Sequence, residues 1–146
     1  MNNNGHQHHE HGHVHSGDSG HAESYLQVEE REGLKITLME HEEALVASLS
    51  LEVFGEAGQV AGLISESLGL LVSKLEAAGA MIGHLKGALS GLTPLATFDS
   101  VGKSVNTSTH QPSAYRLELA VIVFNIDQGL LFKLVQDTAG QLMMAT

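Results

Sequence analysis

The chain has 146 residues, with 17 acidic against 7 basic side chains, ten histidines, no cysteine and a formal net charge of −10. This length allows one domain with its own hydrophobic core. Without cysteine there are no disulfides, thiolate metal sites or cysteine nucleophiles, so imidazole and carboxylate are the strong metal ligands that remain. The acidic balance and the scattered basic residues disfavour nucleic acid as a partner, because few cations are available to displace counterions from a phosphate backbone.

The first 22 residues differ in composition from the rest of the chain. They contain only Met1 and Val14 as sizeable apolar residues, among glycine, asparagine, serine and histidine. Such a segment buries too little surface to offset the entropy of ordering it. We therefore predict a disordered tail over residues 1–22 and a single domain over residues 23–146. Seven of the ten histidines lie in the tail: His6, His8, His9, His11, His13, His15 and His21.

The tail histidines indicate a metal-binding segment. Neutral imidazole is a common ligand for Ni, Co and Zn ions, and an ion needs several such donors at once. His9, His11, His13 and His15 alternate, so an extended chain places them on one side. A divalent transition metal (Ni, Co or Zn) is the predicted cofactor, released as the pH falls through about 6.5. Two alternatives are an engineered tag and a natural tail that binds metal only in the test tube.

Behind the tail, the apolar pattern predicts strands and then a helix. Residues 34–41 and 44–54 alternate apolar and polar side chains, the period of half-buried strands, and "EHEEA" between them suits a hairpin connection. A short edge strand is expected over residues 25–30. Residues 55–79 switch to helical spacing, with Gly79 placed to end the helix.

The second half of the chain repeats this change of period. Residues 80–89 predict a short strand, residues 94–109 one or two weaker strands, and residues 114–127 the strongest strand of the chain. Residues 128–144 predict a second amphipathic helix. This order favours an α+β fold, an antiparallel sheet with two helices on one face, in a ferredoxin-like sandwich.

The same alternation predicts which strand residues face away from the helices. Such a face is a candidate surface for a protein partner or a homodimer. His41, His84, Lys86 and Arg116 on it make a possible ligand or partner face, and its basic groups suit an anionic ligand. The residues expected there are Lys35, Thr37, Met39, His41, Ser48, Ser50, Glu52, Ile82, His84, Lys86, Ala88, Arg116, Glu118, Ala120 and Ile122.

Three features follow one another between Glu56 and Asp127: a long helix, the strand "AMIGHLKGAL" with an "I-x-H-L-K" core, and an apolar strand ending in "FNID". This arrangement resembles the C-terminal domain of the CobW-type metal-handling GTPases, many of which also carry histidine-rich stretches. The GTPase domain of that family has no counterpart here. The resemblance implies a relative of the accessory domain that serves in metal delivery or in cobalamin-related metabolism, with Ile82, His84 and Lys86 as the matching positions.

We therefore expect a cytoplasmic, metal-binding accessory protein, metallochaperone-like, that is not an enzyme. The tripeptide "GKS" lacks the first glycine of a phosphate-binding loop, and no G-x-S-x-G motif presents a nucleophile. No apolar run reaches the roughly 18 residues of a spanning helix, and no secretory signal is visible, so no membrane partner is expected. The alternative is a non-metal interaction module, or one that binds an anionic ligand on the sheet face.

Overall fold

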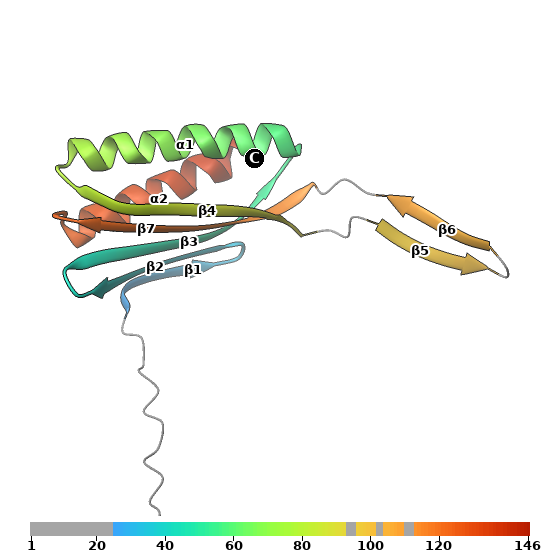
Figure 1. The fold of residues 1–146 in the computed structure, drawn as a ribbon, viewed down its shortest axis with the longest axis horizontal. Coiled ribbons are helices and arrows are strands. Elements are labelled where there is room, and N and C mark those ends of the chain that lie inside the picture. Colours follow the sequence, from blue (N-terminus) through green and yellow to red (C-terminus); the bar gives the residue numbers. More distant parts are fainter. Residues whose placement is uncertain (1–24, 93–95, 102–103, 110–112) are drawn as a thin grey trace, which may run out of the picture.

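The computed structural model describes residues 25–92, 96–101, 104–109 and 113–146. It shows an α+β protein in which one five-stranded antiparallel sheet carries both helices on a single face (Figure 1). The sheet has the order β1-β2-β3-β7-β4. Its strands are β1 (Tyr25–Arg31), β2 (Leu34–His41), β3 (Ala44–Phe54), β7 (Ala114–Phe124) and β4 (Met81–Gly91), and the helices are α1 (Ala57–Ala77) and α2 (Gln128–Ala145).

The strand order confirms the predicted α+β class and defines its topology. β7 lies between β3 and β4 and is antiparallel to both, so β3 and β4 are parallel to each other and α1 connects them across one face. α2 follows β7 and lies over the same face. The central order β3-β7-β4, with a helix after β3 and after β7, is compatible with a ferredoxin-like sandwich. The position beside β3 is occupied by β2, which precedes β3 in the chain.

The hydrophobic core lies between the sheet and the two helices. Every second residue of β2, β3 and β7 points into it, as the alternation predicted. α1 and α2 each contribute a stripe at helical spacing. The largest fully buried side chains are Ile36, Leu38, Leu49, Leu51, Leu71, Leu75, Leu117, Leu131 and Leu142.

Side-chain caps and a glycine fix where the helices begin and end. The Glu56 carboxylate accepts a hydrogen bond from the backbone N–H of Gln59 at 3.1 Å, and Asp127 caps α2 in the same way through Leu130 at 3.0 Å. α1 ends at the position predicted, because Gly79 adopts a φ of 81° that other residues rarely adopt. Among the described residues, neither helix has the length and hydrophobicity needed to cross a bilayer.

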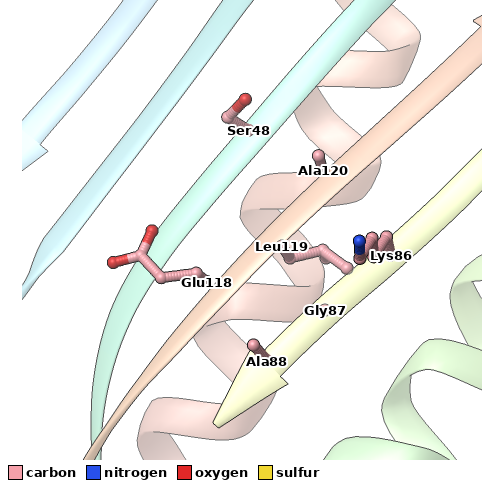
Figure 2. A pocket seen from close by; sticks show the side chains of 7 residues that line it. All are labelled: Ser48, Lys86, Gly87, Ala88, Glu118, Leu119 and Ala120. Atoms are coloured by element: carbon pink, nitrogen blue, oxygen red, sulfur yellow. The ribbon is translucent and has the colours of Figure 1, made fainter. Parts of the chain in front are cut away.

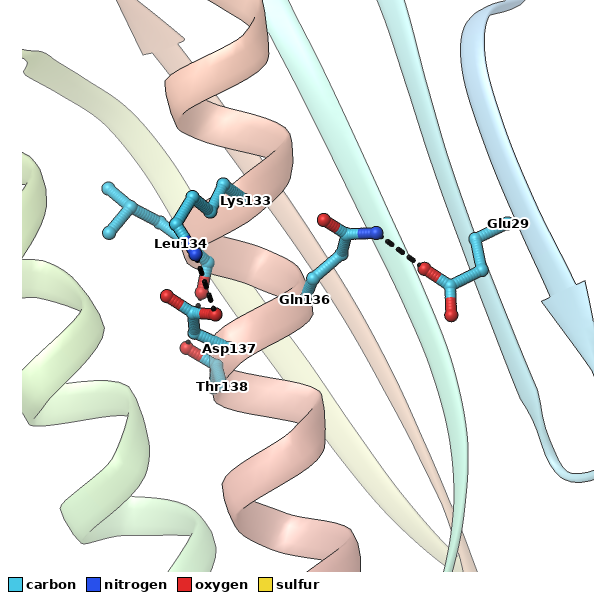
Figure 3. A network of polar contacts seen from close by, with 6 residues as sticks. All are labelled: Glu29, Lys133, Leu134, Gln136, Asp137 and Thr138. Atoms are coloured by element: carbon cyan, nitrogen blue, oxygen red, sulfur yellow. Dashed lines mark hydrogen bonds and ion pairs between the residues drawn. The ribbon is translucent and has the colours of Figure 1, made fainter.

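Polar contacts join α2 to the β1 edge of the sheet. Glu29 pairs with Ile36 and therefore points to the helical side. There its carboxylate accepts a hydrogen bond of 2.6 Å from the side-chain amide of Gln136 on α2 (Figure 3). The neighbouring Arg31 lies 3.5 Å from the sulfur of Met143 near the end of α2. These contacts are consistent with α2 packing over β2 and β3, while α1 packs over β4.

Within residues 94–109, predicted as one or two strands, the described segments 96–101 and 104–109 do not join the main sheet. β5 (Ala96–Val101) and β6 (Ser104–Thr109) pair with each other in a two-stranded sheet that extends beyond the end of β4 and the start of β7 (Figure 1). Their sequences, ATFDSV and SVNTST, contain few large apolar residues. A strand pair of this composition has little surface to bury against the helices.

One predicted face assignment is wrong. Ile82 was expected to face away from the helices together with His84, but it packs against the core. The register of β4 on β7 shifts between these two residues, so that Gly83 is the extra residue of a β-bulge. A bulge of one residue reverses the alternation, and Ile82 therefore points to the opposite side.

Candidate functional site

The sheet has one face that neither helix covers, which we call the open face (Figure 1). Apart from Ile82, the residues predicted to lie on it do so, because the cross-strand pairs place them beside one another in rows. The open face consists of Tyr25, Val28 and Glu30 on β1; Lys35, Thr37, Met39 and His41 on β2; Ala44, Val46, Ser48, Ser50 and Glu52 on β3; Arg116, Glu118, Ala120, Ile122 and Phe124 on β7; and His84, Lys86, Ala88 and Ser90 on β4.

The character of the open face changes along the strands. One end is apolar and contains Met39, Val46, Ile122 and Phe124. The centre is built from small side chains, and the other end is charged.

The centre of the open face contains a shallow depression of about 330 Å³ (Figure 2). It exists because Ala88 and Ala120 have short side chains. Its rim is polar: Lys86 comes from β4 and Glu118 from β7. The full lining is Ser48, Lys86, Gly87, Ala88, Glu118, Leu119 and Ala120.

The two charged groups at this depression differ in their partners. The Glu118 carboxylate accepts a hydrogen bond of 2.8 Å from the Ser50 hydroxyl, which orients it on the face. Within the described part of the chain, no carboxylate lies within salt-bridge distance of Lys86. The Lys86 ammonium is thus available to an anionic group that reaches the depression.

At the charged end, the basic groups are already paired. The Arg116 guanidinium lies 2.7 Å from the Glu52 carboxylate, and the Lys35 ammonium lies 3.3 Å from Glu30. The Arg116 and Glu52 side chains are 46% and 34% exposed, so this pair contributes no more than about 1 kcal/mol. It fixes the geometry of the charged end more than it stabilises the fold.

The four predicted ligand or partner residues share the open face but do not converge on one point. His84 pairs with Ile122, six residues along β7 from Arg116, which corresponds to about 20 Å. Lys86 lies at the central depression, one row from His84. His41 lies at the apolar end, where it lines a second depression of about 410 Å³ with Glu42, Glu43, Ala44, Ile122 and Phe124.

Metal ligands were predicted mainly in the tail. His6, His8, His9, His11, His13, His15 and His21 all lie outside the described residues, as does the predicted boundary between residues 22 and 23. Among the residues that are described, no group of three or more histidine or carboxylate side chains is arranged to hold a metal ion. The described turn around His41, with Glu40, Glu42 and Glu43, does not form such a group.

Sequence reasoning missed the depression at Lys86 and Glu118. The two residues are far apart in the chain and become neighbours only through the register of β4 on β7. The signal that could have shown it is the run of small residues, Ala88 and Ala120, at open-face positions of two long strands. Which of these strands are adjacent is not encoded in either strand alone.

Comparisons of the chain with protein family models, with curated proteins and with solved structures find no match. The resemblance to the CobW-type accessory domain therefore depends on the quoted motifs alone and stays a prediction.

Proposed function

We propose that this protein is a metal-binding accessory protein of metallochaperone type, in which the tail captures Ni, Co or Zn and the domain presents the open face to a partner. The observation that supports this proposal is the presence of seven histidines among residues 1–21. Several imidazoles close together in the sequence can coordinate one late divalent ion together. The proposed setting is the cytoplasm.

The position of β1 relates the tail to the open face. β1 is an edge strand that begins at Tyr25, and Tyr25 pairs with Met39, so the chain enters the domain at the rim of the open face. A segment attached at this rim stays close to anything bound there. Tethering of this kind raises the local concentration of the metal-loaded tail at a docked partner, without any additional contact.

The alternative function is an interaction module that binds an anionic ligand or an acidic partner segment. The specific observation that favours it is the depression of about 330 Å³ with the Lys86 ammonium at its rim. Here the tail would be incidental. The two functions use different residues, so variants of the full chain separate them.

The metal function is tested by calorimetric titration of Ni, Co and Zn into the metal-stripped full chain at neutral pH and again at about pH 5.5. Replacing His9, His11, His13 and His15 by alanine should weaken binding at least about tenfold, because an ion needs several donors at once. Acid should weaken binding to the unchanged chain by protonating imidazole. The matched control is the double variant His41→Ala/His84→Ala, which should bind as the unchanged chain does.

Two results would contradict the metal function. Unchanged affinity in the fourfold tail variant would remove the tail from metal binding. Loss of affinity in the His41→Ala/His84→Ala control would place the ion on the domain. The alternative gains support if inorganic phosphate shifts the backbone amide resonances of Lys86, Ala88 and Ala120, and if Lys86→Met abolishes those shifts.

A further inference from the structure

β4 is an edge strand whose outer backbone groups face no neighbouring strand of the main sheet. It is 11 residues long and pairs only with β7. The opposite edge, β1, is shorter and carries Glu29, Glu30 and Arg31 in sequence, a charge density typical of a protected edge. β4 has a single permanently charged residue, Lys86, and is the edge better suited to pairing with another strand.

We propose that β4 pairs antiparallel with β4 of a second copy of this chain, giving a dimer with one continuous sheet. A two-fold axis perpendicular to the sheet keeps both helical layers on the same side. Residues that pair across the axis then point to the same side of the sheet. The pairing uses the β4 edge together with Lys86, Ala88 and Glu118 of the open face, and leaves the rows of that face on β1, β2 and β3 exposed. The inference does not depend on metal binding.

Charge selects the register of this pairing. An axis through Lys86 places that residue opposite its own copy, and an axis one residue earlier places it opposite the partner's His84. An axis through Ala88 places it opposite the partner's Ser90, whose neighbour on β7 is Arg116. Each of these registers brings basic groups together, which destabilises an antiparallel pair.

An axis through Gly87 brings opposite charges together. Lys86 then lies opposite the partner's Ala88, and Ala88 pairs with Glu118 on β7. Two strand spacings, about 10 Å, separate the backbones of Lys86 and the partner's Glu118, a span that the two side chains cover across the short Ala88. In the single chain the Glu118 carboxylate bonds Ser50 on β3 at 2.8 Å, so it must rotate toward β4 to make this contact. The two-fold axis forms this Lys86–Glu118 contact twice in the dimer.

The helical side of the same edge is also complementary in this register. Leu85 and Leu89 are half-buried against the core, and the axis through Gly87 places Leu85 opposite the partner's Leu89. An apolar groove of about 300 Å³ runs between α1 and β4 and extends this leucine row. Its lining is Ala61, Ile64, Ser65, Leu68, Gly87, Ala88, Leu89 and Leu117.

The flank of α1 at this groove permits close approach of a second α1. Ala61 and Ser65 line the groove, and Gly69 continues the same row one turn later. A Cβ built on Gly69 meets nothing within 4 Å. Small residues spaced by four let two helices pack at about 8–10 Å. In the paired sheet the two α1 helices would lie side by side in antiparallel orientation.

The first test is sedimentation equilibrium of the full chain in EDTA, where metal cannot bridge two tails. The expected mass is twice the 15.5 kDa of one chain. Lys86→Glu and Glu118→Lys should each raise the dimer dissociation constant about tenfold or more, because each places like charges across the axis. The double variant Lys86→Glu/Glu118→Lys should restore it. Lys35→Glu, a charge reversal on β2 away from the axis, is the matched control.

The second test uses single cysteines in a chain that has none of its own. Gly87→Cys should form an intermolecular disulfide under mild oxidation, because the two positions face each other at the axis. Ser90→Cys should not, because it lies opposite the partner's His84. Far-UV circular dichroism verifies that each variant is folded. A monomer at every concentration, an unaltered dimer in Lys86→Glu, or cross-linking through Ser90→Cys alone would each overturn the proposal.

Discussion

Ile82 and His84 lie on opposite faces of the sheet although only Gly83 separates them. Ile82 pairs with Val123 and packs against the core, whereas His84 lies on the open face. The extra residue reverses the alternation of β4. A Cβ built on Gly83 would lie 3.0 Å from the ring atom Cε2 of Phe124, so a side chain at this position has to displace that ring.

We expect Gly83→Val to destabilise the protein by about 1–3 kcal/mol, because the added side chain must displace the Phe124 ring. The measurement is the midpoint of urea unfolding. The control is Gly62→Ala in α1, outside the row Ala61, Ser65 and Gly69, where a Cβ meets nothing within 4 Å. That variant should be more stable by about 0.5–1 kcal/mol. An unchanged midpoint for Gly83→Val would show that the bulge accepts a side chain.

The hydrogen bond between Gln136 and Glu29 should stabilise the β1 edge (Figure 3). Its acceptor is a partly buried carboxylate, so we expect Gln136→Ala to cost about 1.5 kcal/mol. Hydrogen exchange of the β1 amides should accelerate at the same time. Lys133→Ala, which removes an exposed pair with Asp137 on the same helix, should change stability by less than about 0.5 kcal/mol.

The N-cap of α2 gives a third prediction. Asp127→Ala leaves the backbone N–H of Leu130 without its side-chain acceptor, and the expected cost is about 1 kcal/mol. Asp127→Ser should retain most of the stability, because the hydroxyl also accepts this hydrogen bond. Thermal unfolding followed by circular dichroism measures both variants. Equal losses for alanine and serine would mean that capping is not the cause.

The β2–β3 turn contains a strained residue. Glu42 has a φ of 55°, in the left-handed region, which costs about 1 kcal/mol for most side chains. Asparagine tolerates this conformation, so Glu42→Asn should raise the free energy of unfolding by about 0.5–1 kcal/mol. The measurement is urea unfolding. Glu43→Asn at the next position, where φ is not positive, should give no gain. A loss of stability in Glu42→Asn would contradict the strain argument.

The elements that the sequence predicted correctly are those with a strong local period. β3 and β7 alternate over 11 residues each, and α1 repeats its apolar stripe over 21 residues with a glycine beyond its end. Long periodic segments of this kind bury one side in any arrangement. The hairpin turn at Glu42 and Glu43 and the short strand at β1 were also predicted, from turn residues and from alternation.

By itself, then, the sequence determined the α+β class, the order and period of the elements, and the concentration of seven imidazoles in one segment. Each of these depends on composition or on neighbours a few residues apart. Only the tertiary structure decided that β7 separates β3 from β4, that Gly83 turns Ile82 into the core, and that Lys86 and Glu118 meet at one depression. These features arise from strand register, which is set by packing between residues distant in the chain and leaves no local signature.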